Sequence, residues 1–407
     1  MPRVNKLRTA LSAGLGGDTA PLPRARLRTA LTVFFALDGF LFAGWVVRIP
    51  AIKQQTGATA STLGLALLGV SAGAVVTMML TGRLCRRHGS HAVTVVCAVL
   101  LSLSIALPAQ TGSALALGLV LLLFGAAYGG MNVAMNSAAV DLVTALRRPV
   151  MPSFHAAFSF GGMAGAGLGG LVAGSLSPAT HLFALTGFGL LVTALTGPVL
   201  LRAGPSAAPA GRRPADAPEP PKGMSPQARR IVVLFGVIAL CTAYGEGALA
   251  EWGALHLSQD LGAAPGLAAA GYSLFALTMA VGRLSGTALL ERFGQTRTLV
   301  AGGATAAAGM LLGALAPAVW LVLLGFAVAG LGLANIFPVA VGRAGALAGP
   351  SGVAAASTLG YGGMLLGPPV IGFLADWFSL PVALTTVTLL AATAAALGYT
   401  ARNATNT

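Results

Sequence analysis

Few side chains in this chain could do chemistry, because only 8 % of its 407 residues are charged and 56 % are hydrophobic. Asp38 lies ten residues after Arg28 inside an apolar run, which is about 15 Å along a helix. A carboxylate that deep in the ~30 Å apolar core of a bilayer is costly unless it faces a cavity, has a partner or takes up a proton. We therefore expect Asp38 to bind a proton or a solute. The alternative is a structural carboxylate that is hydrogen-bonded to a neighbouring helix.

A polar stripe lies in a later apolar run. Tyr128, Asn132 and Asn136 are spaced four residues apart, which places them along one side of a helix. Asn335 occupies the matching position in the second half of the chain. Because polar side chains within a membrane face protein or water, we expect all four to line a cavity. Polar packing between helices is the alternative.

Two further titratable residues lie within apolar runs. His155 is predicted about 10 Å inside a helix, where it could relay protons, because histidine titrates near neutral pH, or could hydrogen-bond a loop. Glu246 lies between Gly245 and Gly247, where we expect the helix to be broken, which would expose backbone dipoles. Its alternative role, shared with Glu251, is that of a solvated carboxylate near the outer mouth. The three cysteines lack metal-ligand spacing, so neither a metal nor a cofactor is expected.

The elements that carry these residues are apolar runs of membrane-spanning length. A mean hydropathy of +0.83 and so little charge mean that the chain cannot cover itself with polar groups, so lipid must surround most of it. In lipid the backbone must satisfy its own hydrogen bonds, so we expect an all-α multi-pass membrane protein with twelve helices. The predicted spans are 29–47, 61–81, 92–109, 114–137, 151–173, 180–201, 231–253, 266–287, 298–315, 318–341, 352–374 and 380–399.

A proline-rich segment divides these runs six and six. Residues 202–230 read RAGPSAAPAGRRPADAPEPPKGMSPQARR, and such a composition predicts a linker rather than a helix. The expected organisation is a tail at 1–28, a six-helix bundle at 29–201, the linker at 202–230, a second bundle at 231–399 and a tail at 400–407. Residues 1–28 are basic and contain no apolar core of the kind found in cleavable signals.

The basic residues predict the orientation. In this arrangement 21 of the 24 Lys and Arg fall on one side of the membrane, Arg48 and Lys53 fall on the other, and Arg283 lies within the eighth span. The positive-inside rule then places both chain ends and the linker in the cytoplasm, which predicts a protein of the cell membrane. It also accounts for the net charge of +14 without a nucleic-acid partner.

The two halves repeat each other. Three pairs of matching segments lie 201 to 205 positions apart: Arg87-His88-Gly89 with Arg292-Phe293-Gly294, Asn132 with Asn335, and Phe160-Gly-Gly-Met163 with Tyr361-Gly-Gly-Met364. Each pair joins spans six apart, which predicts two six-helix pseudo-repeats. We expect Phe160 and Tyr361 to line the same cavity from equivalent positions.

With this organisation the chain resembles the major facilitator superfamily over nearly its whole length. The loop signature of that family is Gly, three residues and Asp-Arg-x-Gly, and it gates the cytoplasmic face. The matching residues here are Gly82, Arg86, Arg87 and Gly89 in the first half, and Arg283, Glu291, Arg292 and Gly294 in the second. Arg86 departs from the acidic position, so either the lock is weakened in this half or Arg86 is one more cytoplasmic charge. Residues 38–50 and 335–338 resemble a sugar or polyol branch, and residues 153–162 resemble bacterial members that include rhizopine-type transporters.

The resemblance implies a secondary transporter. We expect a monomer that moves a small polar solute, sugar- or polyol-like, by alternating access with coupling to protons. The alternatives are proton-driven efflux of drugs or metabolites and a membrane sensor that keeps the fold without transporting. Residues 114–140 lack the arginine that exporters carry in the fourth span, which counts against drug export. An enzyme is not expected, because the sequence shows no nucleotide loop, metal cluster or catalytic triad.

Overall fold

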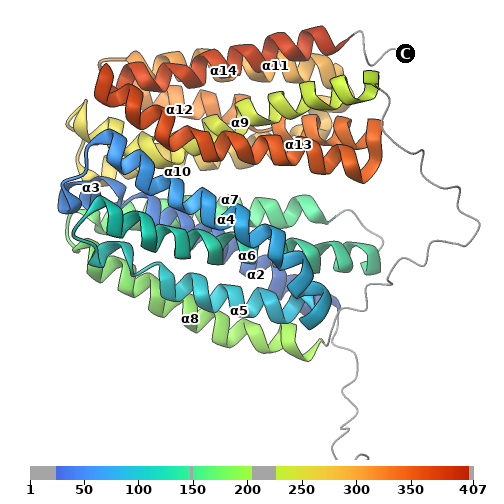
Figure 1. The fold of residues 1–407 in the computed structure, drawn as a ribbon, viewed down its shortest axis with the longest axis horizontal. Coiled ribbons are helices and arrows are strands. Elements are labelled where there is room, and N and C mark those ends of the chain that lie inside the picture. Colours follow the sequence, from blue (N-terminus) through green and yellow to red (C-terminus); the bar gives the residue numbers. More distant parts are fainter. Residues whose placement is uncertain (1–23, 147–149, 204–225, 403–407) are drawn as a thin grey trace, which may run out of the picture.

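The computed structural model describes residues 24–146, 150–203 and 226–402, which are almost entirely helical (Figure 1). The first half holds α2 (Arg24–Val46), α3 (Ile49–Thr56), α4 (Ala60–His88), α5 (Ser90–Ser104), η1 (Pro108–Gln110), α6 (Ala114–Leu146), α7 (Met151–Ala173) and α8 (Pro178–Arg202). The second half holds α9 (Pro226–Gln259), α10 (Pro265–Leu284), α11 (Gly286–Leu315), α12 (Val319–Leu333), α13 (Ile336–Trp377) and α14 (Leu380–Thr400). Most of the predicted tails and linker lie outside the described residues.

Twelve stretches are long and apolar enough to cross a membrane, as predicted. Several helices do not coincide with single spans. Gly294, with φ 75° and ψ 169°, interrupts α11 within the ninth candidate span, Ala288–Leu315, and α13 contains the end of the tenth span as well as the eleventh, Ala355–Trp377. The first helix begins at Arg24, before the expected start at residue 29, because arginine favours helix and its long side chain reaches water.

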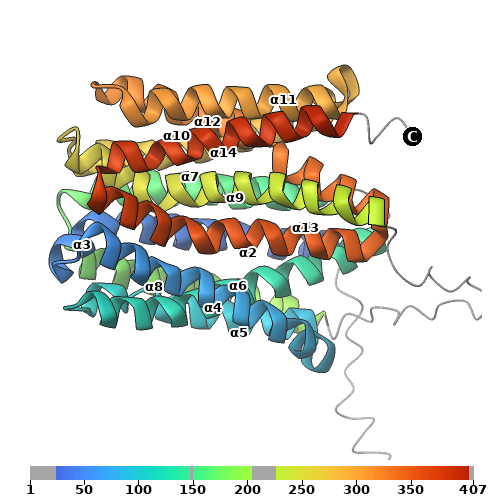
Figure 2. The same ribbon diagram turned by 45° about the horizontal axis from the view of Figure 1, so that its top comes forward.

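The two halves lie side by side and repeat each other in their turns (Figures 1 and 2). Within the described residues, four glycines have positive φ, and they form two pairs that are each 205 positions apart: Gly57 with Gly262, and Gly89 with Gly294. Such φ values are readily adopted only by glycine. The repeat seen in the sequence is therefore also a repeat of backbone conformation.

The two ends of the helical bundle can be told apart by where each half begins and ends. The start of α2, the end of α8, the start of α9 and the end of α14 lie at the right of Figure 1, and we name this the terminal side. The opposite end, where α3 lies, is named the distal side.

The halves are joined on the distal side, where α4 packs against α13 and α7 against α10. The carboxylate of Asp376 in α13 accepts hydrogen bonds from the backbone N–H groups of Ala60 (3.0 Å) and Ser61 (2.8 Å) at the start of α4. Lys53 Nζ donates to Gln259 Oε1 at 3.1 Å, which also links the two halves. These contacts hold the distal ends of the helices together.

Glycines let α2 and α7 approach closely. A Cβ on Gly161 would collide with the carbonyl oxygen of Ala36, and one on Gly165 with that of Phe40. Small residues at such positions allow helices to pack by backbone contact, which is the main source of association in lipid.

A buried arginine ties the distal ends of α2, α7 and α8 together. Arg48 is 2 % exposed, and its Nε donates to His181 Nδ1 at 2.8 Å. Its Nη1 donates to the carbonyl oxygen of Ala173 (3.3 Å) at the end of α7 and to that of Leu176 (3.1 Å) just beyond it. A cation at a helix C-terminus is favourable, because the carbonyl dipoles there are otherwise unpaired.

Candidate functional site

A cavity of about 880 Å³ lies between the two halves, and both contribute to its walls. It reaches the terminal side, because Met151 at the start of α7 and Gln295 beside the Gly294 turn line it. On the distal side the contacts between α4 and α13, and between α7 and α10, close it. Within the described residues the cavity is therefore open on the terminal side and closed on the distal side.

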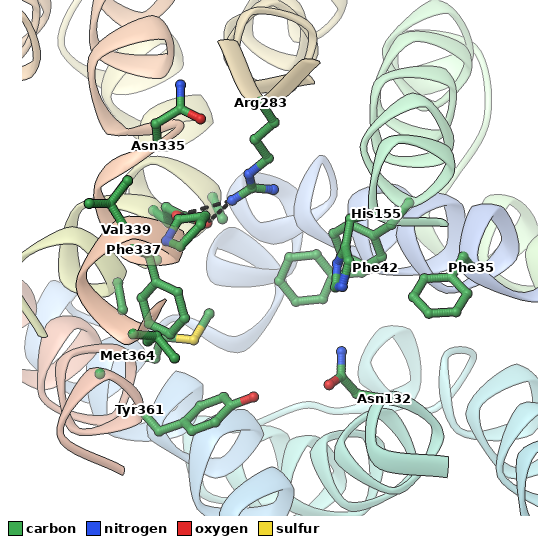
Figure 3. Close-up of a pocket in the computed structure, with 18 of the residues that line it drawn as sticks. Phe35, Phe42, Asn132, His155, Arg283, Asn335, Phe337, Val339, Tyr361 and Met364 are labelled. Carbon is green, nitrogen blue, oxygen red and sulfur yellow. Dashed lines mark hydrogen bonds and ion pairs between the residues drawn. The ribbon is translucent and has the colours of Figure 1, made fainter. Parts of the chain in front are cut away.

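An ion pair lies within this cavity. Arg283 of α10 points inward, and its Nη2 donates to both carboxylate oxygens of Glu246 on α9, at 3.2 and 3.1 Å (Figure 3). Both side chains are about one quarter exposed, at 26 % for Arg283 and 25 % for Glu246, so the pair remains in contact with the cavity. Each charge thus has a partner within the protein itself.

The first half contributes polar groups set among aromatic rings. Phe42 stacks on Tyr128 with centroids 5.0 Å apart, and His155 meets the ring of Phe35 edge-on at 5.6 Å. Asn132 lies one turn after Tyr128 on α6 and also lines the cavity. Within the described residues, the Tyr128 hydroxyl and the His155 ring make no hydrogen bond, so both keep hydrogen-bonding capacity toward the cavity that they line.

The second half faces them with two tyrosines and an asparagine. Tyr361 of α13 extends its hydroxyl toward Asn132 across the cavity (Figure 3). Tyr272 of α10 also lines it, and in the described part of the chain neither hydroxyl is hydrogen-bonded. Asn335 is already engaged, because its Nδ2 donates to the carbonyl oxygen of Gly282 at 2.8 Å. Phe337 and Met364 supply apolar surface between these groups.

The comparisons with known proteins cover most of the chain and agree on its family. The model of the Major Facilitator Superfamily matches residues 29–255 and 235–406. The chain belongs to this superfamily. An MFS-type transporter of Yersinia pestis is 32 % identical over 375 residues, covering 91 % of this chain and 94 % of the relative. The membrane protein MosC of Rhizobium meliloti is 30 % identical over 363 residues, covering 88 % and 85 %.

Solved structures show the same superfamily fold. The nucleoside transporter NupG has a TM-score of 0.69 at 15 % identity, covering 92 % of this chain and 98 % of that one. A bacterial homologue of the human lysosomal transporter Spinster has a TM-score of 0.73 at 14 % identity, covering 95 % and 98 %. The protein is thus a multi-pass membrane protein with the twelve-helix, two-repeat fold and the transporter function of the superfamily.

Most of the predicted cavity residues line the cavity between the two halves, and two lie elsewhere. Tyr128, Asn132, His155, Glu246, Asn335 and Tyr361 line it. Asn136 does not, because its Nδ2 donates back to the carbonyl oxygen of Asn132 at 2.8 Å. Phe160 is 43 % exposed on the outside of α7, while His155 and Phe158 of the same helix line the cavity.

Asp38 lies beside the cavity rather than in it. It is fully buried, at 0 % exposure, and neither carboxylate oxygen has a hydrogen-bond partner within the described residues. It lies one turn before Phe42, which does line the cavity and stacks on Tyr128.

The predicted gating residues lie on the terminal side, except for one. Arg86 and Arg87 end α4 as exposed side chains, and Glu291 and Arg292 are exposed in α11 before the turn at Gly294. In the described part of the chain none of these four bridges the two halves; Arg292 lies over the ring of Phe293 at 5.6 Å. Gly82 and Gly89 shape the end of α4 and the turn after it. Arg283, by contrast, belongs to the cavity through its pair with Glu246.

Two expectations for α9 are wrong. The helix is continuous from Pro226 to Gln259, so no break occurs at Glu246. Glu251 is not a solvated outer carboxylate, because it is 8 % exposed and lines the cavity. Tyr272 was not among the predicted cavity residues, although its position in an apolar run is comparable to that of Tyr128.

Proposed function

We propose that this protein moves a small polar, ring-shaped solute of the sugar or polyol kind across the cell membrane by alternating access, with coupling to protons. The main support is a cavity between two repeated halves that is open on one side and closed on the other by contacts between the halves. Rocking of one six-helix half against the other would exchange the open and closed sides.

The orientation follows from charge. The basic residues gather on the terminal side, and the positive-inside rule makes this the cytoplasmic side. The conformation described here would then be open to the cytoplasm. Ser71 Oγ donates to the carbonyl oxygen of Met364 at 3.1 Å, so contacts between the halves extend from the distal side to about the middle of α4.

The solute class is inferred from the lining groups. Tyr128, Asn132, His155, Tyr272 and Tyr361 present hydroxyl, amide and imidazole groups from both halves, among aromatic faces. Hydroxyl-rich rings match this pattern, because their edges exchange hydrogen bonds and their C–H faces rest on aromatic rings.

Proton coupling is assigned to Asp38. An ionised carboxylate without any partner is very costly at 0 % exposure, so Asp38 must be protonated in this conformation. Rearrangement of Phe42 and Tyr128 in another conformation would give it access to water and allow release of the proton. A proton gradient can then supply the energy for transport.

A second candidate is efflux of an amphipathic compound. It is favoured by the many apolar and aromatic residues in the walls, among them Phe35, Phe158, Phe275 and Phe337. The direction of movement and the polarity of the solute separate the two candidates.

The test begins with a thermal-shift screen of purified protein against sugars, polyols, amino acids and amphipathic cations. Solutes that stabilise the protein are then offered to proteoliposomes with an imposed pH gradient. We expect a polyhydroxylated ring to accumulate in the parent, and Asp38→Asn to exchange it without accumulation. Accumulation by the Asn variant equal to that of the parent would rule out Asp38 as the coupling site. Stabilisation by amphipathic cations alone would favour efflux.

A further inference from the structure

Helix α9 carries two acidic residues in the cavity wall, and only one of them has a partner. Glu246 pairs with Arg283 at 3.1 Å. Glu251 follows five residues later, about 7.5 Å further along the helix toward the distal side. It lines the same cavity but is 8 % exposed, and its Oε2 is enclosed with no hydrogen-bond partner in the described residues.

The surrounding helices do not neutralise Glu251. The helices that pack against α9 are α2, α3, α10, α12, α13 and α14, and the link before α3 carries Arg48. Their titratable groups, with those of α9 itself, are Arg24, Arg26, Arg28, Asp38, Arg48, Lys53, Arg229, Arg230, Cys241, Tyr244, Glu246, His256, Tyr272, Arg283, Arg343, Tyr361, Asp376 and Tyr399.

Each cation near the cavity or the distal side either has another partner or lies away from Glu251. Arg283 is held by Glu246, Arg48 by His181 and backbone carbonyls, and Lys53 by Gln259. His256 Nδ1 lies 2.8 Å from Asp260 Oδ2. Arg343 lines the same cavity, but from the terminal-side part of α13, before the eleventh span begins. Within the described residues, none of them forms an ion pair with Glu251.

An enclosed carboxylate in this setting needs a positive charge that the protein does not supply. A proton is the smallest, and it removes the charge altogether, which is how buried acids without partners are normally accommodated. We propose that Glu251 is a proton-binding site separate from Asp38, and that it holds a proton in the conformation described here.

The position of Glu251 gives this proton a path. Glu251 lies further along α9 toward the closed distal side than Glu246 does, eight residues before Gln259. Opening of that side would bring water to Glu251 from the face opposite to the present opening. The use of this proton in transport rests on the proposed function, but its presence on Glu251 does not.

Infrared spectroscopy tests the occupancy without any knowledge of the solute. A protonated carboxyl group has a carbonyl stretch well separated from that of a carboxylate, and labelling with 13C-glutamate shifts glutamic bands without moving those of Asp38. We expect purified protein at neutral pH to show a protonated-carboxyl band that moves on labelling. Because labelling needs no substitution, this measurement does not depend on the folding of a variant.

Variants then assign the band. Glu251→Gln keeps the size and neutrality of the protonated acid and should abolish the labelled band. Glu246→Gln is the matched control on the same helix, and it should leave the band in place, since Glu246 already has Arg283 as its partner. Absence of a band that shifts with 13C-glutamate, or its survival in Glu251→Gln, would overturn the proposal. Failure of transport in every assay with the infrared result intact would instead count against the proposed function.

Discussion

Replacing Asp376 with alanine should favour opening of the distal side. Asp376 belongs to α13 in the second half, and its two oxygens bind the first two N–H groups of α4 in the first half, at 3.0 and 2.8 Å. Thr59 already caps α4 from within its own half through the N–H of Thr62. Loss of Asp376 therefore leaves the helix intact but removes a bond between the halves.

The size of the effect follows from the geometry. An anion at a helix N-terminus contributes roughly 0.3–1 kcal/mol, and loss of a side-chain cap costs roughly 0.5–2 kcal/mol. Because Asp376 is exposed, water compensates part of the loss, and we take about 1–2 kcal/mol as the net change. Since 1.4 kcal/mol is a factor of ten, the ratio of distal-open to distal-closed molecules should rise about 5- to 30-fold.

Spin labels at Gln54 and Ala264, one on the distal side of each half, would report this ratio as a shift in their distance distribution. The three native cysteines are first replaced. Asp260→Asn is the matched control, because it removes the same charge on the same side from a residue that pairs with His256 of its own half. Burial lowers the pKa of Lys53, while Asp376 and, to a lesser extent, Asp260 act in the opposite direction, so both variants remove an influence of the same sign on that ammonium. An unchanged distribution in Asp376→Ala, or an equal shift in both variants, would refute the reasoning.

Three further predictions use other parts of the structure. Tags at Gly211 and at the C-terminus should be cytoplasmic and a tag at Gly112 external, and any one on the wrong side contradicts the orientation. Arg48→Ala should lower the free energy of unfolding by about 2–4 kcal/mol, because the buried acceptors of its hydrogen bonds lose their donor. The measurement is the thermal midpoint in detergent, and an unchanged midpoint would show that the Arg48 hydrogen bonds are dispensable for stability. Gly161→Leu should prevent α2 from packing on α7 and reduce the amount of folded protein in the membrane. Gly174→Leu is the control, because no atom lies near its added Cβ, and it should not reduce that amount. Equal yields of the two variants would count against backbone packing between α2 and α7.

The sequence predicts the fold well because a bilayer imposes strict requirements. Each span needs about 20 apolar residues and must form its own hydrogen bonds, so the twelve helices can be recognised one by one. Tertiary burial has no such local signal. Glu251 lies near the distal end of its helix, which suggests contact with water, but the closure of the two halves at that side encloses it. The number of residues along a helix gives depth, whereas burial depends on which helices meet there.

Helix geometry explains the misplaced Asn136. Steps of four residues in a helix of 3.6 residues per turn rotate by about 40° each, so Asn136 is turned about 80° from Tyr128. That rotation is enough to take its side chain out of the cavity wall and onto the backbone of Asn132. In α6 this stripe therefore keeps only its first two members on the cavity surface.

The difference between Phe160 and Tyr361 comes from a change of register between the repeats. Both precede a Gly-Gly-Met sequence, so the repeat predicts equivalent positions. In α7, however, the first glycine of the pair, Gly161, packs against the backbone of α2, whereas in α13 it is the second, Gly363, that packs against the backbone of α9. One residue of shift rotates a helix by about 100°, which turns Phe160 outward and Tyr361 into the cavity. The repeated sequence thus specifies the same close packing in both halves, and the choice of packing glycine makes the two walls of the cavity chemically different.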